Sequence, residues 1–296
     1  MRLWLSLGVV VLGVALGATG TLAAWNDLVP VTGTTVGAAR VDLTVQGLDT
    51  VSTFTSISTN SMGPSVTDAG ILTVTNNGTV PLDYYVTAAS TNADGKGLAS
   101  ALAVKVTGAS AVTGTFPSAT CSGTTLPGSA SSFTTAAFLG SAGSPRTLAA
   151  GATETLCVEA DLSASAPTSL QNATTNVSFS FTAATSPTPT NWSDSVAVGA
   201  TTIKTPTVTT PTINCAGQNK NVSNIAWTST NATTYEVHYG SASSLTDTTT
   251  GSPYSIAMPG SGTVYIIAIY GNTTWMSGAS NTRTYSGNGV SSATCS

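Results

Sequence analysis

The sequence predicts an all-β protein, in which a jelly-roll-like antiparallel sandwich is followed by a second, smaller sandwich. Three observations lead to this prediction. Hydrophobic residues make up 41% of the chain and charged residues only 7%. Apolar and polar residues alternate along many short segments, and turn-forming residues separate those segments. Alternation with a period of two is the pattern of a strand that buries one face. The length of 296 residues is enough for two domains.

Most of the alternating segments fall in residues 24–203, which we expect to form the first domain. The predicted strands cover residues 40–47, 70–75, 81–89, 103–107, 154–162 and 176–183. The turn signal Asn76-Asn77-Gly78-Thr79 lies between the second and third of these strands, so we expect them to form a hairpin. Residues 120–150 are rich in Gly, Ser and Pro and are expected to run across the surface, with Phe133 and Phe138 as isolated apolar points.

Residues 204–212, KTPTVTTPT, are expected to be a Thr/Pro linker of limited flexibility. The following segment, 213–296, resembles a fibronectin type III or related immunoglobulin-like module. Trp227 matches the buried tryptophan of an early strand. Tyr235, Val237 and Tyr239 match the central strand, and Tyr265, Ile267 and Ile269 match the strand that bears a tyrosine corner.

The N-terminus predicts an exported protein. Arg2 precedes an uncharged run, and its apolar part, residues 3–18, has the length of a signal-peptide core and is short for a membrane span. We expect residues 1–23 to be a signal peptide that is cleaved between Ala23 and Ala24, which leaves no stable membrane span. The alternative is a retained N-terminal anchor.

The junction after the signal peptide carries Thr21, Ala23, Ala24, Trp25 and Asp27, and the strand Val41-Asp42-Leu43 follows it. This junction resembles that of the TasA/camelysin family of Gram-positive surface proteins, which a dedicated signal peptidase processes. The phrases CSGTTLPGS, SPRTLAAGATETLCVEADL and NVSFSFTA are similar to the actinobacterial branch. The resemblance covers the signal peptide and most of residues 24–203. It implies a secreted protein, extracellular or on the cell surface of a Gram-positive bacterium, that assembles into biofilm-matrix fibres.

The mature N-terminus is the candidate interaction strand. Trp25, Asp27, Val29 and Val31 form a segment that is apolar at alternate positions and is suited to adding a strand to a neighbouring sheet. Head-to-tail addition generates an open fibre. The expected partners are the signal peptidase and then the protein itself, as a homopolymer, or related matrix subunits. The alternative is that this segment pairs within its own domain or hangs free.

A weak internal repeat supports a strand at both ends of the first domain. Residues 192–203 echo residues 25–36, with six of twelve positions identical: one Trp, one Asp, two Val and two Thr. Each copy begins with a tryptophan that we expect to be exposed.

Four cysteines, Cys121, Cys157, Cys215 and Cys295, suggest disulfides in an exported chain. Four cysteines allow three pairings. Pairing Cys121 with Cys157 and Cys215 with Cys295 keeps each bridge inside one proposed domain. The alternative is four free thiols.

Composition and motifs argue against catalysis. Camelysin-type relatives are labelled metallopeptidases, but the only histidine is His238 and no His-Glu-x-x-His pair occurs. No Gly-x-Ser-x-Gly occurs either. Glu154, Glu159 and Asp161 are expected to be a solvated strand face, and His238 an exposed surface residue. The net charge of −4 without a basic cluster argues against nucleic-acid binding. We expect no enzyme, no cofactor and no metal.

The sequence therefore favours a structural fibre subunit. The alternative is a monomeric surface adhesin whose C-terminal domain binds a glycan or a protein. Trp275, in the predicted loop GNTTWMSG, is the candidate contact, although a core or edge position is the competing interpretation.

Overall fold

The computed structural model describes residues 39–108, 111–186, 192–214, 225–254, 261–271, 273–287 and 293–295. The cleavage residues Ala23 and Ala24 and the candidate interaction strand with Trp25, Asp27, Val29 and Val31 lie outside the described residues, as does Cys215. The fold is all-β, as the sequence predicts, and its strands are grouped into two sets of sheets.

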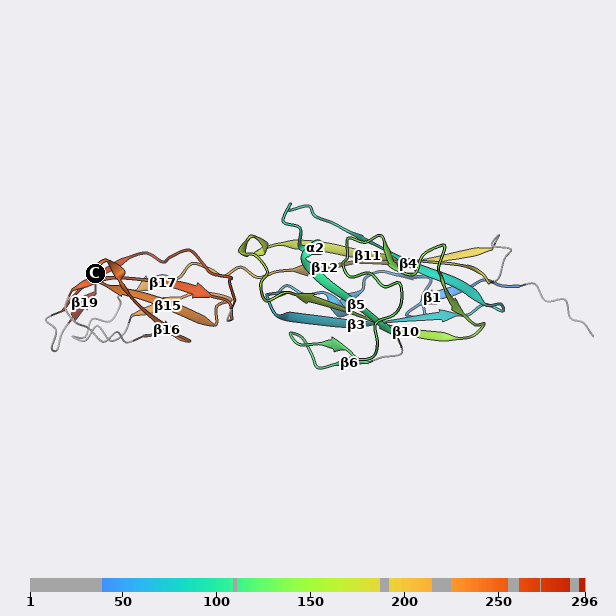
Figure 1. Ribbon diagram of the computed structural model, residues 1–296, viewed down its shortest axis with the longest axis horizontal. Helices are drawn as coiled ribbons and strands as arrows, with labels where there is room; N and C mark the ends of the chain where they lie inside the picture. Colours follow the sequence, from blue (N-terminus) through green and yellow to red (C-terminus); the bar gives the residue numbers. More distant parts are fainter. Residues whose placement is uncertain are drawn as a thin grey trace, which may run out of the picture. The chain divides into compact units, whose positions relative to one another are not determined.

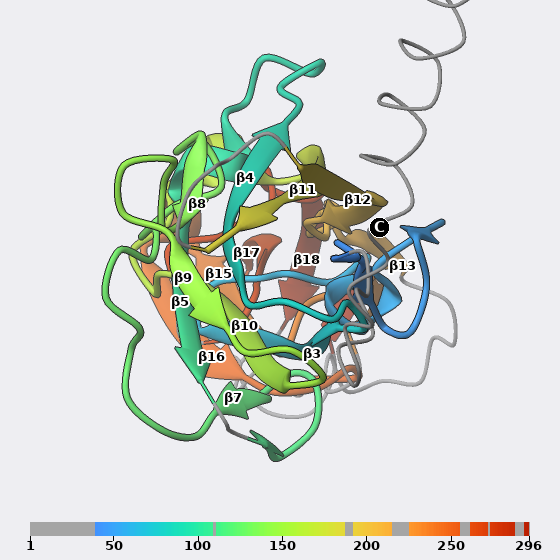
Figure 2. The same cartoon turned by 90° about the vertical axis from the view of Figure 1, so that its right-hand side faces the viewer.

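Residues 43–204 form two sheets that face each other. The four-stranded sheet has the order β1 (Leu43–Val45), β3 (Val66–Asn76), β10 (Thr153–Leu162), β5 (Leu102–Gly108). The six-stranded sheet has the order β2 (Thr50–Val51), β12 (Ser193–Lys204), β11 (Thr174–Thr185), β4 (Leu82–Ser90), β8 (Ala137–Leu139), with β9 (Arg146–Leu148) also on β4. Pairing is antiparallel except between β2 and β12. Figures 1 and 2 show the two layers.

The short elements of this sandwich are η1 (Thr55–Ile57), α2 (Leu98–Ala101), η2 (Thr168–Leu170), and the pair β6 (Val112–Thr113) and β7 (Thr120–Cys121).

Alternation places the core between the two sheets. On β11, Val177, Phe179 and Phe181 are buried while the residues between them are half-buried. Phe179 contacts the ring of Phe138 at a centroid distance of 4.8 Å, and Phe133 stacks on Phe138 at 6.0 Å. The expectation that residues 120–150 only cross the surface was wrong, because this segment contributes two of the core's aromatic rings and the strands β8 and β9.

The expected hairpin between residues 70–75 and 81–89 was also wrong. β3 belongs to the four-stranded sheet and β4 to the six-stranded sheet, so the chain crosses between layers at this turn. Asn76 holds the crossover. Its buried side-chain amide donates to the carbonyl oxygens of Val80 and Leu148, and its Oδ1 accepts the Gly78 N–H at 2.9 Å. The arch lets Leu72 of β3 and Leu82 of β4 face the same core.

Residues 212–295 form the second set of sheets. β13 (Thr212–Asn214) pairs with β14 (Ala226–Thr228). The five-stranded sheet has the order β16 (Leu245–Thr249), β15 (Thr234–Gly240), β17 (Gly262–Ile269), β18 (Arg283–Gly287), β19 (Ala293–Cys295), with η3 (Ser241–Ser243) after β15.

Trp227 of β14 is buried, as expected, and meets Tyr235 edge-on at 5.2 Å. On β17, which matches the strand that bears a tyrosine corner, one alternate set of residues is buried. Val264, Ile266 and Ala268 are the buried residues, so Tyr265, Ile267 and Ile269 lie on the opposite face of the sheet.

The segment between the two sets of sheets is hydrogen-bonded along its length. The Thr205 N–H donates to the Ala173 carbonyl oxygen at 3.0 Å, and its hydroxyl donates to the Leu170 carbonyl oxygen. The Val208 N–H donates to Oε1 of Gln171 at 2.9 Å. Thr205 and Val208 are buried. This Thr/Pro segment is therefore stiffened by contacts as well as by its prolines.

Asp68 is a buried acid on the core side of β3, in phase with Val66 and Leu72. Its carboxylate accepts the Ala69 N–H at 3.0 Å. Burial raises the pKa of Asp68 from 3.8 to about 6, and the backbone bond lowers it by less. The folded protein thus disfavours the charged form.

We expect Asp68→Asn to stabilise the protein at pH 8 but not at pH 4. The folded pKa lies above the unfolded value, so the stability that protonated Asp68 contributes is complete below about pH 4. It is lost as the pH rises through 6, and the loss is at most about 3 kcal/mol. Urea denaturation at both pH values measures the difference, with exposed Asp49→Asn as the control. An equal effect of Asp68→Asn at both pH values would contradict this account.

Candidate assembly surface

One lateral side of the first sandwich, where β5 and β8 are the edges, is closed by backbone. The Val104 N–H of β5 donates to the Ser131 carbonyl oxygen at 3.0 Å, and the Leu126 N–H donates to that of Val106 at 2.9 Å. The Ala130 N–H donates to the Phe138 carbonyl oxygen of β8 at 2.7 Å. Residues 125–131 thus bond to both sheets and cover part of each edge on this side.

The opposite side, where β1 and β12 lie, is closed only in part. β2 pairs with Ala197 and Val198 of β12. Further along, the Lys204 N–H donates to the Thr59 carbonyl oxygen at 2.7 Å. Within the described residues, no strand pairs with the outer edge of the first part of β12, from Ser193 to Val196.

The peptide groups of Ser193 and Ser195 point toward this outer edge. The Thr185 N–H of β11 donates to the Trp192 carbonyl oxygen at 3.2 Å. In an antiparallel ladder the bonded positions alternate, so Asp194 and Val196 also face β11, and Ser193 and Ser195 face away from it. Both serines are exposed.

Asp194 bridges the gap between the two sheets at this point. Its Oδ2 accepts the Leu43 N–H of β1 at 2.7 Å, and its Oδ1 accepts the Ser195 N–H at 2.8 Å. We call Leu43 and residues 192–195 the β1–β12 seam. A carboxylate, rather than a strand, accepts two of the edge donors of the seam, the N–H groups of Leu43 and Ser195.

Two exposed apolar side chains flank the seam. Trp192, directly before β12, is 50% exposed. Leu48 is 52% exposed and lies two residues before Thr50, which pairs with Ala197. An unpaired edge with apolar side chains at its two ends has the features of a strand-docking surface.

The second copy of the internal repeat forms β12. Val196, Val198 and Ile203 face the core and are fully buried, while Trp192 is exposed as expected. A bulge at Gly199 lets the strand pass the backbone of Ser52, because a Cβ at Gly199 would lie 1.9 Å from the Ser52 carbonyl oxygen. The repeat is therefore the pattern of a lateral strand of this sandwich. Its first copy, residues 25–36, lies outside the described residues.

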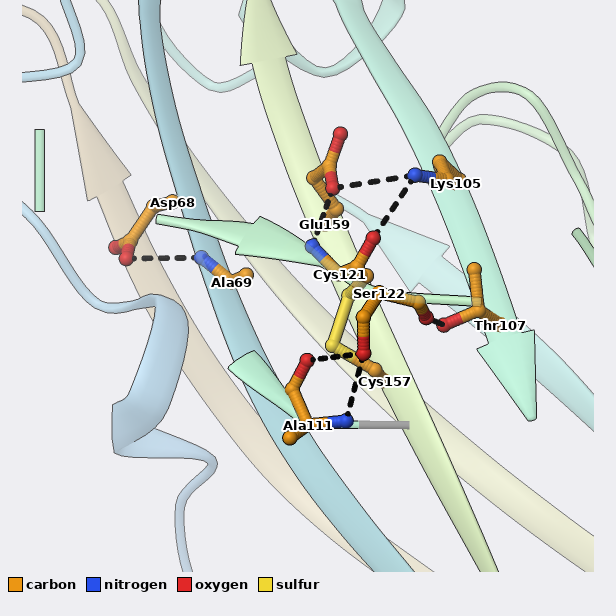
Figure 3. The surroundings of a disulfide bond; sticks show 9 residues. All are labelled: Asp68, Ala69, Lys105, Thr107, Ala111, Cys121, Ser122, Cys157 and Glu159. Atoms are coloured by element: carbon orange, nitrogen blue, oxygen red, sulfur yellow. Dashed lines mark hydrogen bonds and ion pairs between the residues drawn. A yellow bond between two sulfur atoms is a disulfide. The ribbon is translucent and has the colours of Figure 1, made fainter. Parts of the chain in front are cut away.

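The disulfide Cys121–Cys157, one of the two expected bridges, fastens β7 to the outer face of β10 (Figure 3). Around it, Oε2 of Glu159 accepts the Cys121 N–H at 2.5 Å. Lys105 Nζ donates to the Cys121 carbonyl oxygen at 3.0 Å and lies 3.6 Å from Glu159. Only the backbone of Cys295, in β19, is described, so its pairing with Cys215 stays a prediction.

The expectation that Glu154, Glu159 and Asp161 share a solvated face was wrong. Glu159 is held against the β7 backbone (Figure 3). Glu154 differs from Glu159 by an odd number of positions and so points to the other side of β10, toward the core. There it forms an ion pair with Arg146 and accepts the Tyr84 hydroxyl at 2.5 Å. Burial and this bond raise the pKa of Tyr84.

Arg146 also lines a cleft of about 470 Å³, with Pro127, Gly128, Ala137, Gly140, Ser141, Ser144, Pro145 and Thr147. Its guanidinium group is already engaged by Glu154, and none of the lining side chains is aromatic. The cleft therefore offers neither a free pair of charges nor a stacking platform for a ligand.

Trp275 is not an exposed ligand contact, and the competing interpretation, a core position, is the correct one. The side chain is fully buried, and its indole Nε1–H lies 2.9 Å from the Ala166 carbonyl oxygen and 3.1 Å from that of Pro167. The ring lies 6.1 Å from that of Tyr270. Trp275 thus joins the segment that follows β17 to the core cluster of residues 43–208.

His238 is also less exposed than expected. Its ring stacks on Tyr265 at 4.5 Å. Its Nε2 lies 3.2 Å from Glu236 and its Nδ1 lies 3.1 Å from the Thr246 hydroxyl. Both ring nitrogens therefore have partners on the sheet surface.

Within the described ranges, no group of three or more His, Cys, Asp or Glu side chains could hold a metal ion. A membrane-spanning helix is likewise not found among the described residues.

No family model matches the sequence, and no curated protein matches it. Three solved structures show remote likenesses. The ASH/PapD-like domain of human CEP192 is 12% identical with a TM-score of 0.26, covering 58% of this chain and 92% of that one. A structure described as a chaperone–tip adhesin complex of CFA/I fimbriae biogenesis is 9% identical with a TM-score of 0.22, covering 79% and 93%. The secreted serine protease VesC from Vibrio cholerae is 10% identical with a TM-score of 0.19, covering 80% and 47%. Likenesses this remote carry no argument about function.

Trp275→Ala should lower the free energy of unfolding by about 3–5 kcal/mol, because it removes a buried indole and leaves a cavity. The matched control is Trp192→Ala, which removes the same side chain from an exposed position and should change stability by no more than about 0.5 kcal/mol. Urea denaturation measures both. Equal losses for the two variants would contradict the buried position of Trp275.

Replacing Cys121 and Cys157 together by serine should lower the free energy of unfolding by about 4 kcal/mol, from the loop entropy of a 36-residue separation. Under reducing conditions, the double variant and the wild type should unfold alike. If the denaturation midpoint of the wild type is the same with and without reductant, the bridge is absent in solution.

Proposed function

We propose that this protein is a secreted structural subunit of a cell-surface or extracellular-matrix fibre. The signal peptide, residues 1–23, is removed, and the freed segment from Ala24 onward adds as a strand to a second copy. Repetition of this contact gives a head-to-tail fibre. The proposed localisation is the exterior or surface of a Gram-positive cell.

The observation that carries this proposal is the difference between the two lateral sides of the first sandwich. Residues 125–131 close one side with backbone bonds to both sheets. On the other side, the carboxylate of Asp194 stands where a strand could bond. A sheet edge without a partner strand is a template for pairing with another chain.

Two sequence features support the same proposal. The mature N-terminal segment repeats the pattern of β12, a strand that lies at this side. The junction around Trp25 and Asp27 resembles that of the TasA/camelysin family. The adhesin alternative has lost its candidate contact, because Trp275 is buried.

The absence of enzymatic activity belongs to this proposal too. The chain has a single histidine, and that histidine is held in a stack on the surface of the five-stranded sheet.

We expect the mature protein, starting at Ala24, to form regular fibres at high concentration, as seen by electron microscopy. A version that lacks Ala24–Val36 should fold but stay monomeric, because it has lost the donor segment. Circular dichroism and thermal unfolding check that the shortened protein is folded. Fibres of the shortened protein, or a persistently monomeric full-length mature protein, would refute the proposal.

A further inference from the structure

We infer that the β1–β12 seam is the acceptor site for the N-terminal segment of a second copy, and that Asp194 guards this site before assembly. This inference rests on the proposed function and adds the position of the contact. The occupant is the segment from Trp25 to Val31 of the neighbouring molecule.

The seam is favoured because backbone already bonds to β5, to β8 and to the later part of β12. Residues 125–131 bond to both β5 and β8. β2 and the chain at Thr59 bond to the later part of β12. The N–H groups of Ser193 and Ser195 point outward, and within the described residues neither has a backbone partner.

The side chains around the seam fit the proposed donor. Trp192 and Leu48 lie exposed at its two ends, and Trp25, Val29 and Val31 of the donor would cover apolar surface there. The internal repeat puts valines of the donor at the positions of Val196 and Val198, which already pack on this side of the core. The donor therefore carries the spacing that a lateral strand of this sandwich needs.

Asp194 occupies the acceptor edge in a way that an incoming strand can displace. In the single chain its Oδ1 accepts the Ser195 N–H, so this edge donor is not left unpaired in the monomer. When a strand adds, a carbonyl oxygen of the donor replaces Oδ1 at Ser195, while Oδ2 can keep the Leu43 N–H. The Asp194 side chain thus disfavours non-specific strand pairing at this edge, while no strand among the described residues occupies the edge permanently.

β16 is the competing acceptor. It is the edge strand of the five-stranded sheet, and Leu245 is 45% exposed. It offers one sheet edge, however, whereas the seam presents the edges of two sheets that Asp194 joins. A donor strand at the seam would match what residues 125–131 do on the opposite side.

Ser195→Pro tests the site. Proline removes the outward N–H of Ser195, which β11 does not use, and so should block strand addition without unpairing β11. We expect the concentration needed for fibre formation to rise at least about tenfold, the effect of losing a hydrogen bond and adding a clash. Ser195→Ala is the matched control, because it removes the hydroxyl but keeps the N–H. It should assemble like the wild type.

Hydrogen exchange of the unmodified protein gives a readout that does not depend on the folding of the proline variant. In the monomer the Ser193 amide has no backbone partner among the described residues, and the Ser195 amide is held only by the side chain of the neighbouring Asp194. Both should therefore exchange at least about a hundredfold faster in the monomer than in fibres, where strand addition buries them. The corresponding amides of β16 should exchange at the same rate in both states.

The outcomes separate the two proposals. Deleting Ala24–Val36 could abolish fibres while the Ser195→Pro variant still assembles like the wild type and the Ser195 amide exchanges at the same rate in monomer and fibre. In that case the fibre function stands and the seam is not its acceptor. If the Ser195 amide is already protected in the monomer and loses protection on the deletion, the chain's own segment occupies the seam and the inference is overturned. Fibres that survive the deletion overturn both proposals.

Discussion

The structure depends on one constraint: each sheet of a sandwich ends in a row of peptide groups that must find partners. The protein meets this constraint in several ways. Residues 125–131 bond to the edges of two sheets at once. The amide of Asn281 imitates a peptide group, accepting the Ile213 N–H of β13 at 2.8 Å and donating to its carbonyl oxygen. At the β1–β12 seam the Asp194 carboxylate accepts the edge N–H groups of Leu43 and Ser195. Because it is a side chain, it can rotate away when a strand binds.

Alternation in the sequence predicted which residues face the core wherever a strand is long and regular. Val177, Phe179 and Phe181 of β11 lie in the core, as do Leu156 and Val158 of β10. The sequence failed where the partner of a strand, rather than its existence, was in question. An Asn-Gly turn tells that the chain reverses, but the buried amide of Asn76 and its bonds to residues 80 and 148 decide that it changes sheets.

The candidate site was only partly within reach of sequence reasoning. The echo between residues 25–36 and 192–203 identified β12 and the exposed Trp192. The sequence could have shown that Glu154 faces the core, because it lies an even number of positions from the buried Leu156 and Val158 on β10. The burial of Trp275 could not be predicted, because it depends on Ala166 and Pro167, more than a hundred residues earlier in the chain. Asp194 carried no signal of its own beyond its place in the repeat.

The hydrogen bonds of Asp194 limit which interactions could supply the free energy of the proposed assembly. Exchanging the Asp194 carboxylate for a donor carbonyl at Ser195 replaces one hydrogen bond with another, so this step contributes little net free energy. The remaining backbone bonds replace bonds to water and are worth about 1 kcal/mol each. Burial of Trp192 and Leu48 under the donor would then supply most of the affinity, at about 25 cal/mol per Å² of apolar surface. The hydrogen bonds of the seam would set register and direction, and the exposed apolar side chains at its ends would set how tightly one copy holds the next.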